Sequence, residues 1–152
     1  MQSVRLNKKE YYLEMLKLVA ARSTCIRRAV GAIITDEYGH VLSTGYNGVP
    51  RDFDHCTDNP CSGAADLPGN TTNCLAVHAE QNALLQCSKL DRAHTIYCSC
   101  VPCFTCAKLL ANTDIEVVIC VEDYADKRGQ NILLERGIVL EIGGKIIEQE
   151  IA

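Results

Sequence analysis

The second half of the chain alternates short apolar runs with helix-length segments, and this alternation constrains the fold more than any other feature. Residues 93–100, 115–121 and 138–142 have the length and composition of strands. Segments with helical composition separate them, from Pro102 to about residue 112 and over 128–136. Strands that alternate with helices favour a partly parallel sheet covered by helices.

The first half is predicted to add a helix and a hairpin to this sheet. Apolar residues recur at helical spacing over about 7–23, as expected for a helix with one buried face. Two apolar runs, 30–35 and 41–46, flank a turn-forming segment and indicate a β-hairpin. Residues 75–89 again have helical composition. The whole chain, 1–152, has the length of a single domain.

Composition limits the partners of the chain. The formal net charge is −4 and the isoelectric point about 5.5, whereas proteins that hold long nucleic acids depend on basic clusters. Lys17 interrupts the only apolar stretch near the start, so no secretion signal is predicted. No apolar run reaches the ~18 residues of a membrane span. We therefore expect a cytoplasmic protein that binds neither membranes nor polymeric nucleic acid.

Cysteine is unusually frequent, with ten residues in the chain. Outside an oxidising compartment, such cysteines favour metal binding or catalysis over a disulfide framework. Three of them, Cys56, Cys61 and Cys74, lie in residues 51–74, a segment rich in Gly, Pro, Asp and Asn without periodicity. Irregular loops longer than ~12–15 residues are uncommon unless they are functional or clipped in place.

Two short motifs carry the chemistry. His78-Ala79-Glu80 stands at one predicted helix start, and Pro102-Cys103-Phe104-Thr105-Cys106 at another. Either motif alone is weak evidence, since HxE is common and CxxC also occurs in redox pairs. In this order they match H-x-E…P-C-x-x-C, the signature of zinc-dependent deaminases.

The residue types suit a catalytic zinc. Such a site uses three protein ligands and keeps a fourth position for water. His78, Cys103 and Cys106 are the predicted ligands, and two thiolates near a helix start balance the charge of the cation. Glu80 is then predicted as the acid–base residue, which takes a proton from the water, passes it to a ring nitrogen and protonates the departing ammonia.

Four further cysteines are predicted to be small apolar residues. Cys98 and Cys100 lie two apart on a strand, so they share one face and point to the core or the site wall. Free cysteine is usually buried in this way. A redox or second metal role is the alternative for this pair. Cys87 and Cys120 have the same packing interpretation.

Five segments together resemble the deoxycytidylate deaminase family, over nearly the whole length of the chain. They are CIRRAVGAIIT (25–35), STGYNGVP (43–50), VHAEQNALLQC (77–87), PCFTCAKLL (102–110) and VEDYADK (121–127). The resemblance implies a cytidine-deaminase-like α/β fold of three layers, α/β/α, with a five-stranded mixed sheet flanked by helices. It also implies zinc-dependent hydrolysis of dCMP to dUMP and ammonia, which supplies dUMP for thymidylate synthesis.

The resemblance assigns roles near the substrate. It implies that Asn47, Ala79, Arg27 and Tyr124 contact dCMP, with Arg27 and Tyr124 near the 5′-phosphate. Asn47 is also a plain turn residue, because Asn-Gly is a strong turn signal. Arg28 and Lys127 are neighbours that could share the phosphate, but each is more simply a solvated surface charge. Residues 98–101, CSCV, depart from the commoner family pattern.

Regulation and assembly are further implications of the resemblance. Many members are homohexamers that dCTP activates and dTTP inhibits, and Mg²⁺ accompanies the triphosphate. The corresponding regulatory segment here is Gly45, Tyr46, Asn47 and Gly48. Some members also hold a structural zinc, for which Cys25 and Cys56 have matching spacings. Cys61 and Cys74 would complete a Cys₄ set, with His55 as an alternative ligand.

Two other function classes remain open at this point. The first is a deaminase of another cytosine nucleoside or nucleotide, of tRNA adenosine or of single-stranded DNA. The acidic charge disfavours polymers, and a free nucleoside has no phosphate for Arg27. The second is a non-catalytic, zinc-stapled nucleotide-binding subunit, which would have no use for Glu80. Turnover of dCMP, CMP and deoxycytidine separates these possibilities.

Overall fold

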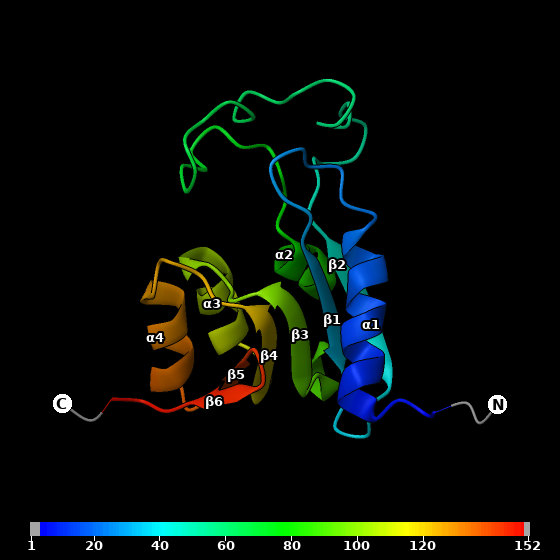
Figure 1. Ribbon diagram of the computed structural model, residues 1–152, viewed down its shortest axis with the longest axis vertical. Helices are drawn as coiled ribbons and strands as arrows, with labels where there is room; N and C mark the ends of the chain where they lie inside the picture. Colours follow the sequence, from blue (N-terminus) through cyan, green and yellow to red (C-terminus); the bar gives the residue numbers. More distant parts are fainter. Residues whose placement is uncertain (1–3, 151–152) are drawn as a thin grey trace.

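A six-stranded mixed sheet forms the centre of the protein, seen in a computed structural model that describes residues 4–150 (Figure 1). The order is β2-β1-β3-β4-β5-β6, and only the pairs β3–β4 and β4–β5 are parallel. The strands are β1 (Gly31–Thr35), β2 (Val41–Tyr46), β3 (Thr95–Cys100), β4 (Val117–Glu122), β5 (Val139–Ile142) and β6 (Lys145–Ile147).

The prediction of three layers is confirmed. On one face, α1 (Lys8–Ala20) packs Tyr12 and Leu16 against Ile33 and Tyr97. The other three helices lie on the opposite face, where the larger core contains Ile34, Ile96 and Leu110 (Figure 1). These helices are α2 (Ala79–Gln86), α3 (Phe104–Ala111) and α4 (Arg128–Glu135), and a 3-10 turn, η1 (Leu90–Arg92), precedes β3.

The prediction of five strands was one short. Gly143 and Gly144 both have positive φ, so the chain turns back after β5 and adds β6 antiparallel to it. β6 has only three residues, Lys145–Ile147, of which two are apolar, whereas strands usually have about five or six residues. The sequence therefore shows no strand pattern there.

Helix starts also differ from the sequence prediction. Pro102 was expected to open α3, with both cysteines in its first turn. The helix begins instead at Phe104; Cys103 is the extended N-cap, and Cys106 alone lies in the first turn. The helix predicted over 75–89 is shorter, because its start is fixed at the N-cap His78.

The segment predicted to be irregular contains no helix or strand. We call residues 49–76 the long loop; it stands above the sheet, beyond the start of α2 (Figure 1). Its ends meet at an isolated bridge between Gly48 and Val77, with N–H···O distances of 3.1 and 2.7 Å. The loop is therefore closed at its base on the element that carries His78.

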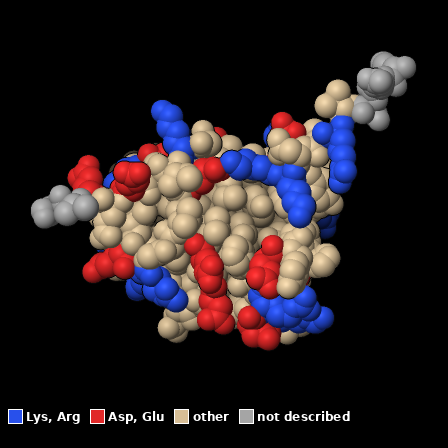
Figure 2. Space-filling view, turned by 90° about the horizontal axis from the view of Figure 1, so that it is seen from below, with Lys and Arg blue, Asp and Glu red and all other residues tan. Residues whose placement is uncertain are grey.

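The opposite end of the molecule has a mixed surface. Seen from below, Lys and Arg side chains alternate with Asp and Glu around uncharged residues (Figure 2). This pattern differs from the single-sign basic surface that polynucleotides select. Within residues 4–150, none of the helices is long and apolar enough to cross a membrane.

Candidate active site

The start of α2 places a ring and a carboxylate side by side. His78 is the N-cap and has extended backbone, so its side chain leaves the helix end. Its own backbone N–H donates to Oε1 of Gln81 at 2.8 Å, which fixes the first turn. Glu80 is the second residue of the helix and is 4% exposed. One helix start thus supplies two of the predicted site residues.

The start of α3 brings two sulfurs to the same point. Nδ1 of His78 lies 3.4 Å from Sγ of Cys103 and 3.3 Å from Sγ of Cys106. Tetrahedral zinc would hold such nitrogen and sulfur atoms about 3.5 Å apart, given its usual bond lengths. Among the described residues, this trio is the only group with three potential ligand atoms all within 4.8 Å of one another. The residues therefore fit a zinc ion.

The two thiols differ in their affinity for protons. The pKa of Cys103 is lowered to about 4, first because the Cys106 thiol donates a hydrogen bond to its sulfur and also because His78 lies beside it. The pKa of Cys106 is raised, because its thiol donates a hydrogen bond to the sulfur of Cys103 and because its own sulfur is buried. Binding of a metal ion displaces such protons, since the thiolate is the ligand form.

Glu80 is a buried carboxyl group at the wall of the same cluster. Burial raises its pKa, and the negative charge of Cys103 adds to this effect. A raised pKa brings a carboxyl group closer to the range in which it can both accept and donate protons near neutral pH. The three-ligand cluster and Glu80 together have the composition of a catalytic metal site, in which the acid–base residue is separate from the ligands.

These groups open into a pocket of about 600 Å³. Besides His78 and Glu80, it is lined by Cys100, Tyr124 and the loop residue Thr71. This volume is in the range of small-molecule sites. The two-residue spacing of Cys98 and Cys100 on β3 has the predicted result: both are buried, Cys98 in the core and Cys100 at the pocket wall.

Asn47 and Ala79 both line this pocket. The Asn47 amide accepts from Val30 N–H at 2.9 Å and donates to the Arg28 carbonyl at 2.7 Å. One donor and one lone pair of that amide are left for a ligand. Ala79 is the first residue of α2, so its N–H has no acceptor within the helix. Both residues can therefore present polar atoms to a bound molecule.

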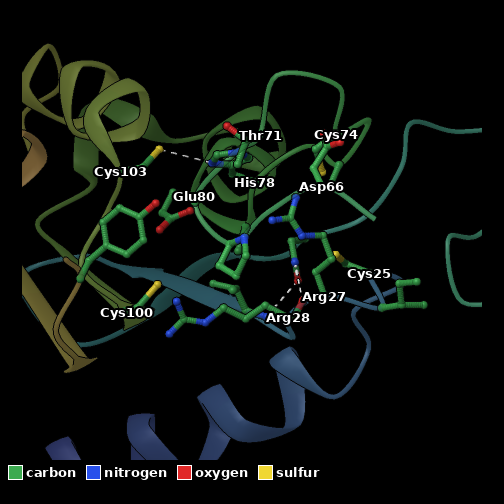
Figure 3. Close-up of a pocket in the computed structure, with 18 of the residues that line it drawn as sticks. Cys25, Arg27, Arg28, Asp66, Thr71, Cys74, His78, Glu80, Cys100 and Cys103 are labelled. Atoms are coloured by element: carbon green, nitrogen blue, oxygen red, sulfur yellow. Dashed lines mark hydrogen bonds between the residues drawn. The ribbon is translucent and has the colours of Figure 1, made fainter. Parts of the chain in front are cut away.

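The two neighbouring arginines run in different directions (Figure 3). Arg27 rises to the long loop and donates to the carbonyls of Gly63, Leu67 and Asn70, at 3.2, 3.0 and 2.8 Å. Arg28 extends toward Cys100 and contacts Glu122 at 2.8 Å. Tyr124, the other residue expected near the phosphate, also lines the pocket. Lys127 pairs with Asp123 at 2.6 Å and is not among the residues that line it.

The four loop-associated cysteines are neighbours, although they do not form a cluster as tight as the catalytic one. The Cys61 backbone N–H lies 3.4 Å from Sγ of Cys56. Backbone hydrogen bonds, first that of Leu75, lower the pKa of the Cys61 thiol, and contacts with Cys56 and Cys74 add to this. Burial raises the pKa of Cys74, and the charges of Cys61 and Cys25 contribute.

The segment from Gly45 to Gly48 is tightly packed. A Cβ atom added to Gly45 would meet Ala79 O and Ala83 N of α2, and one added to Gly48 would meet Oγ1 of Thr24. Tyr46 is half-buried, with the Arg22 guanidinium 5.9 Å from its ring centre. Gly45 thus allows β2 to approach α2 closely, which positions the helix that carries His78 and Glu80, and Gly48 allows the chain to pass close to Thr24.

A comparison with protein families assigns this site. The family model described as "Cytidine and deoxycytidylate deaminase zinc-binding region" matches residues 6–122. The chain belongs to this deaminase family. The family's zinc-binding region includes the cluster of His78, Cys103 and Cys106.

Relatives of this chain are named deoxycytidylate deaminases. The protein from Mycobacterium phage D29 is 38% identical over 117 residues, covering 72% of this chain and 91% of that protein. The protein from Saccharomyces cerevisiae is 35% identical over 134 residues, covering 86% of this chain and 43% of that protein. The chain spans less than half the length of the two yeast relatives, 43% and 42%.

A solved structure shares the fold of this chain. The dCMP deaminase of the cyanophage S-TIM5, in complex with dCMP and dUMP, superposes with a TM-score of 0.74 at 29% identity. The match covers 92% of this chain and 99% of that one. The predicted cytidine-deaminase-like fold is confirmed by this similarity.

Some residues of this candidate site were missed by sequence analysis. Asp66 and Thr71 line the pocket from the long loop, and Gln81 fixes the helix start. The loop lacks periodicity, so its sequence gave no signal for which side chains face inward. The Gln81 contact had a signal, because Glu or Gln three residues after an N-cap is typical of a capping box.

Proposed function

We propose that the protein hydrolyses dCMP to dUMP and ammonia, and so supplies dUMP for thymidylate synthesis. The observation that carries this proposal is the buried Glu80 beside a His78–Cys103–Cys106 cluster in an open pocket. Support for the substrate comes from relatives named deoxycytidylate deaminase and from a similar structure that binds dCMP and dUMP.

Each site residue has a separate role in this hydrolysis, which replaces the amino group of the cytosine ring by oxygen. Zinc held by His78, Cys103 and Cys106 would lower the pKa of a bound water to about 7. Glu80 would accept a proton from the attacking water as its oxygen adds to the carbon that bears the amino group, and deliver that proton to the adjacent ring nitrogen. Glu80 would then take the second proton from the oxygen newly bound to that carbon and pass it to the amino group, so that the carbon–nitrogen bond breaks and ammonia leaves. Asn47 and Ala79 orient the nucleotide.

An ammonia-release assay tests the proposal. Purified, zinc-loaded protein is given dCMP, CMP or deoxycytidine, with and without dCTP–Mg²⁺. Preferential turnover of dCMP is expected. Preference for deoxycytidine or CMP would favour the alternative of another cytosine deaminase. No turnover of any of the three by protein with a full catalytic zinc would favour a non-catalytic nucleotide-binding subunit.

We also propose a second, structural zinc at Cys25, Cys56, Cys61 and Cys74. Support comes from the contact of Cys61 with Cys56 and from the influence of Cys25 and Cys61 on Cys74. Four thiolates form the closed type of zinc site. Metal analysis should give about two zinc per chain. Cys56→Ser should remove one zinc and His78→Ala the other. His55, on the exposed side of the loop, is the alternative ligand.

Regulation and assembly complete the proposal. The resemblance supports activation by dCTP and inhibition by dTTP, each with Mg²⁺, at Gly45, Tyr46, Asn47 and Gly48. Since both glycines are packed, Tyr46 supplies most of the side-chain surface there. Titration of Glu80→Gln protein with dCTP should show sites that dCMP does not displace. Light scattering tests the predicted homohexamer, and cell fractionation tests the predicted cytoplasmic location.

A further inference from the structure

The carboxyl end of β3 lines the catalytic pocket through Cys100 and Val101, and β4 ends beside it. These two strands are parallel, and their last residues, Cys100 and Glu122, lie opposite each other in the sheet. The Val101 N–H also donates to the Glu122 carbonyl at 3.0 Å. Ligands of open α/β sheets bind at the carboxyl ends of parallel strands. A cation at this edge is therefore placed to meet a substrate group that lies away from the reacting ring.

Arg28 supplies a cation at that edge. It lines the same pocket as Glu80, Cys100 and Tyr124, and Figure 3 shows its side chain running to Cys100. Its backbone is held in place, because its carbonyl accepts a hydrogen bond from the Asn47 side-chain amide at 2.7 Å. Among the described residues its guanidinium contacts one group, the Glu122 carboxylate. Four of its five donors are thus open to a ligand.

Arg27 is engaged elsewhere. Its guanidinium donates to three carbonyls of the long loop, and these bonds hold the loop over the pocket. Contact with a phosphate would require it to release the loop. Arg28 has only an exposed ion pair to give up, with its side chain 42% and that of Glu122 67% exposed. Exposed ion pairs of this kind contribute little to the stability of a protein, so this one is easily exchanged.

On this basis, and resting on the proposed function, we propose that Arg28 recognises the 5′-phosphate of the substrate by exchanging Glu122 for it. Arginine binds phosphate through paired, charge-assisted hydrogen bonds. Glu122 holds Arg28 at the strand ends before substrate arrives, and its negative charge opposes the phosphate once the exchange has begun. Arg27 is a positioning residue that acts through the loop.

Steady-state assays with dCMP and deoxycytidine test this exchange. Arg28→Met should lower kcat/KM for dCMP by roughly 10–150-fold, mainly through KM, because one charge-assisted contact is lost. The value for deoxycytidine should fall far less. Arg28→Lys should recover part of the loss. Glu122→Gln should lower KM for dCMP by about two- to fivefold, since the competing carboxylate is gone.

Two matched variants serve as controls. Arg136→Met removes a guanidinium whose described contact is the Ala111 carbonyl, away from this pocket, and should leave both substrates unaffected. Arg27→Met should lower both values by similar factors. Zinc content reports whether each protein is intact.

The outcomes separate this inference from the function on which it rests. A wild-type enzyme that prefers dCMP, with the preference unchanged in Arg28→Met, would overturn the role of Arg28 alone. Equal losses for both substrates in Arg28→Met would give it a structural role instead. A wild-type enzyme without preference for dCMP would overturn the proposed substrate, whatever the variants show.

Discussion

The His78–Cys103–Cys106 cluster and the long loop both contain cysteines, but the backbone that carries these cysteines is fixed in different ways. Cys103 and Cys106 are fixed by the start of α3, next to a parallel strand pair. Cys56 and Cys61 lie in a segment without helix or strand, attached through a bridge at its base and through Arg27. The comparison shows that regular elements set the catalytic geometry unaided, whereas the loop depends on a few specific attachments.

The largest effect is expected from a change that breaks the chemistry and leaves both regions folded. Glu80→Gln keeps the shape of the side chain and removes its proton transfers. We expect kcat to fall by at least about 10²–10⁴-fold, the usual contribution of an acid–base residue. Ammonia release and zinc content should be measured on the same preparation. Near-normal turnover with full zinc would exclude Glu80 from the mechanism.

A change in the regular region should affect the stability of the whole protein. Gly45→Ala places a methyl group against Ala79 O and Ala83 N. Overpacking of this kind costs about 1–3 kcal/mol, and because α2 must shift, turnover should fall as well. Urea unfolding measures the first effect.

A change in the attachment of the loop should have a smaller and local effect. Arg27→Met removes three hydrogen bonds to loop carbonyls. Local opening should become easier by about 1–2 kcal/mol, or roughly 5–30-fold in the open population. Limited proteolysis between residues 51 and 74 should accelerate by this factor, with global unfolding little changed. If dCMP turnover falls far more than deoxycytidine turnover, Arg27 itself contacts the phosphate.

The smallest effect sharpens the distinction between metal-binding and packing cysteines. Cys98 is fully buried in the core beside Cys120. A hydrogen bond with Cys120, together with burial, keeps the pKa of the Cys98 thiol well above the usual range. Cys98→Ala should cost about 1 kcal/mol, the effect of a small cavity. Zinc content and turnover should be unchanged. Loss of zinc in this variant would reveal a further metal role for β3.

Sequence analysis predicted the positions of site residues best where these residues lie close together in the chain, because the local backbone then determines their geometry. The HxE and PCxxC motifs each fall at a helix start, so the positions of His78, Glu80 and Cys106 follow from local backbone alone. Cys103 was placed in the first turn of its helix, because proline favours the first helical position, whereas Cys103 is the N-cap. Most strands were visible as apolar runs, but β6 was too short.

Contacts over long sequence separations were not predictable in the same way. Arg27 meets carbonyls of residues 63–70, and this contact depends on the path of a loop without periodicity. Arg27 and Arg28 are adjacent and chemically identical, so the pattern could not distinguish the one that faces the loop from the one that faces the strand ends. Their separation depends on backbone direction, which Asn47 helps to fix from another element.

The bridge between Gly48 and Val77 also has an evolutionary consequence. Because these two residues are hydrogen-bonded in both directions, the path between them can change in length without moving β2 or α2. Doubling the length of a flexible loop costs only about 0.6 kcal/mol in closure entropy. This place in the chain can therefore accept insertions and deletions, so that descendants of one ancestor acquire new entrances to an unchanged reaction centre.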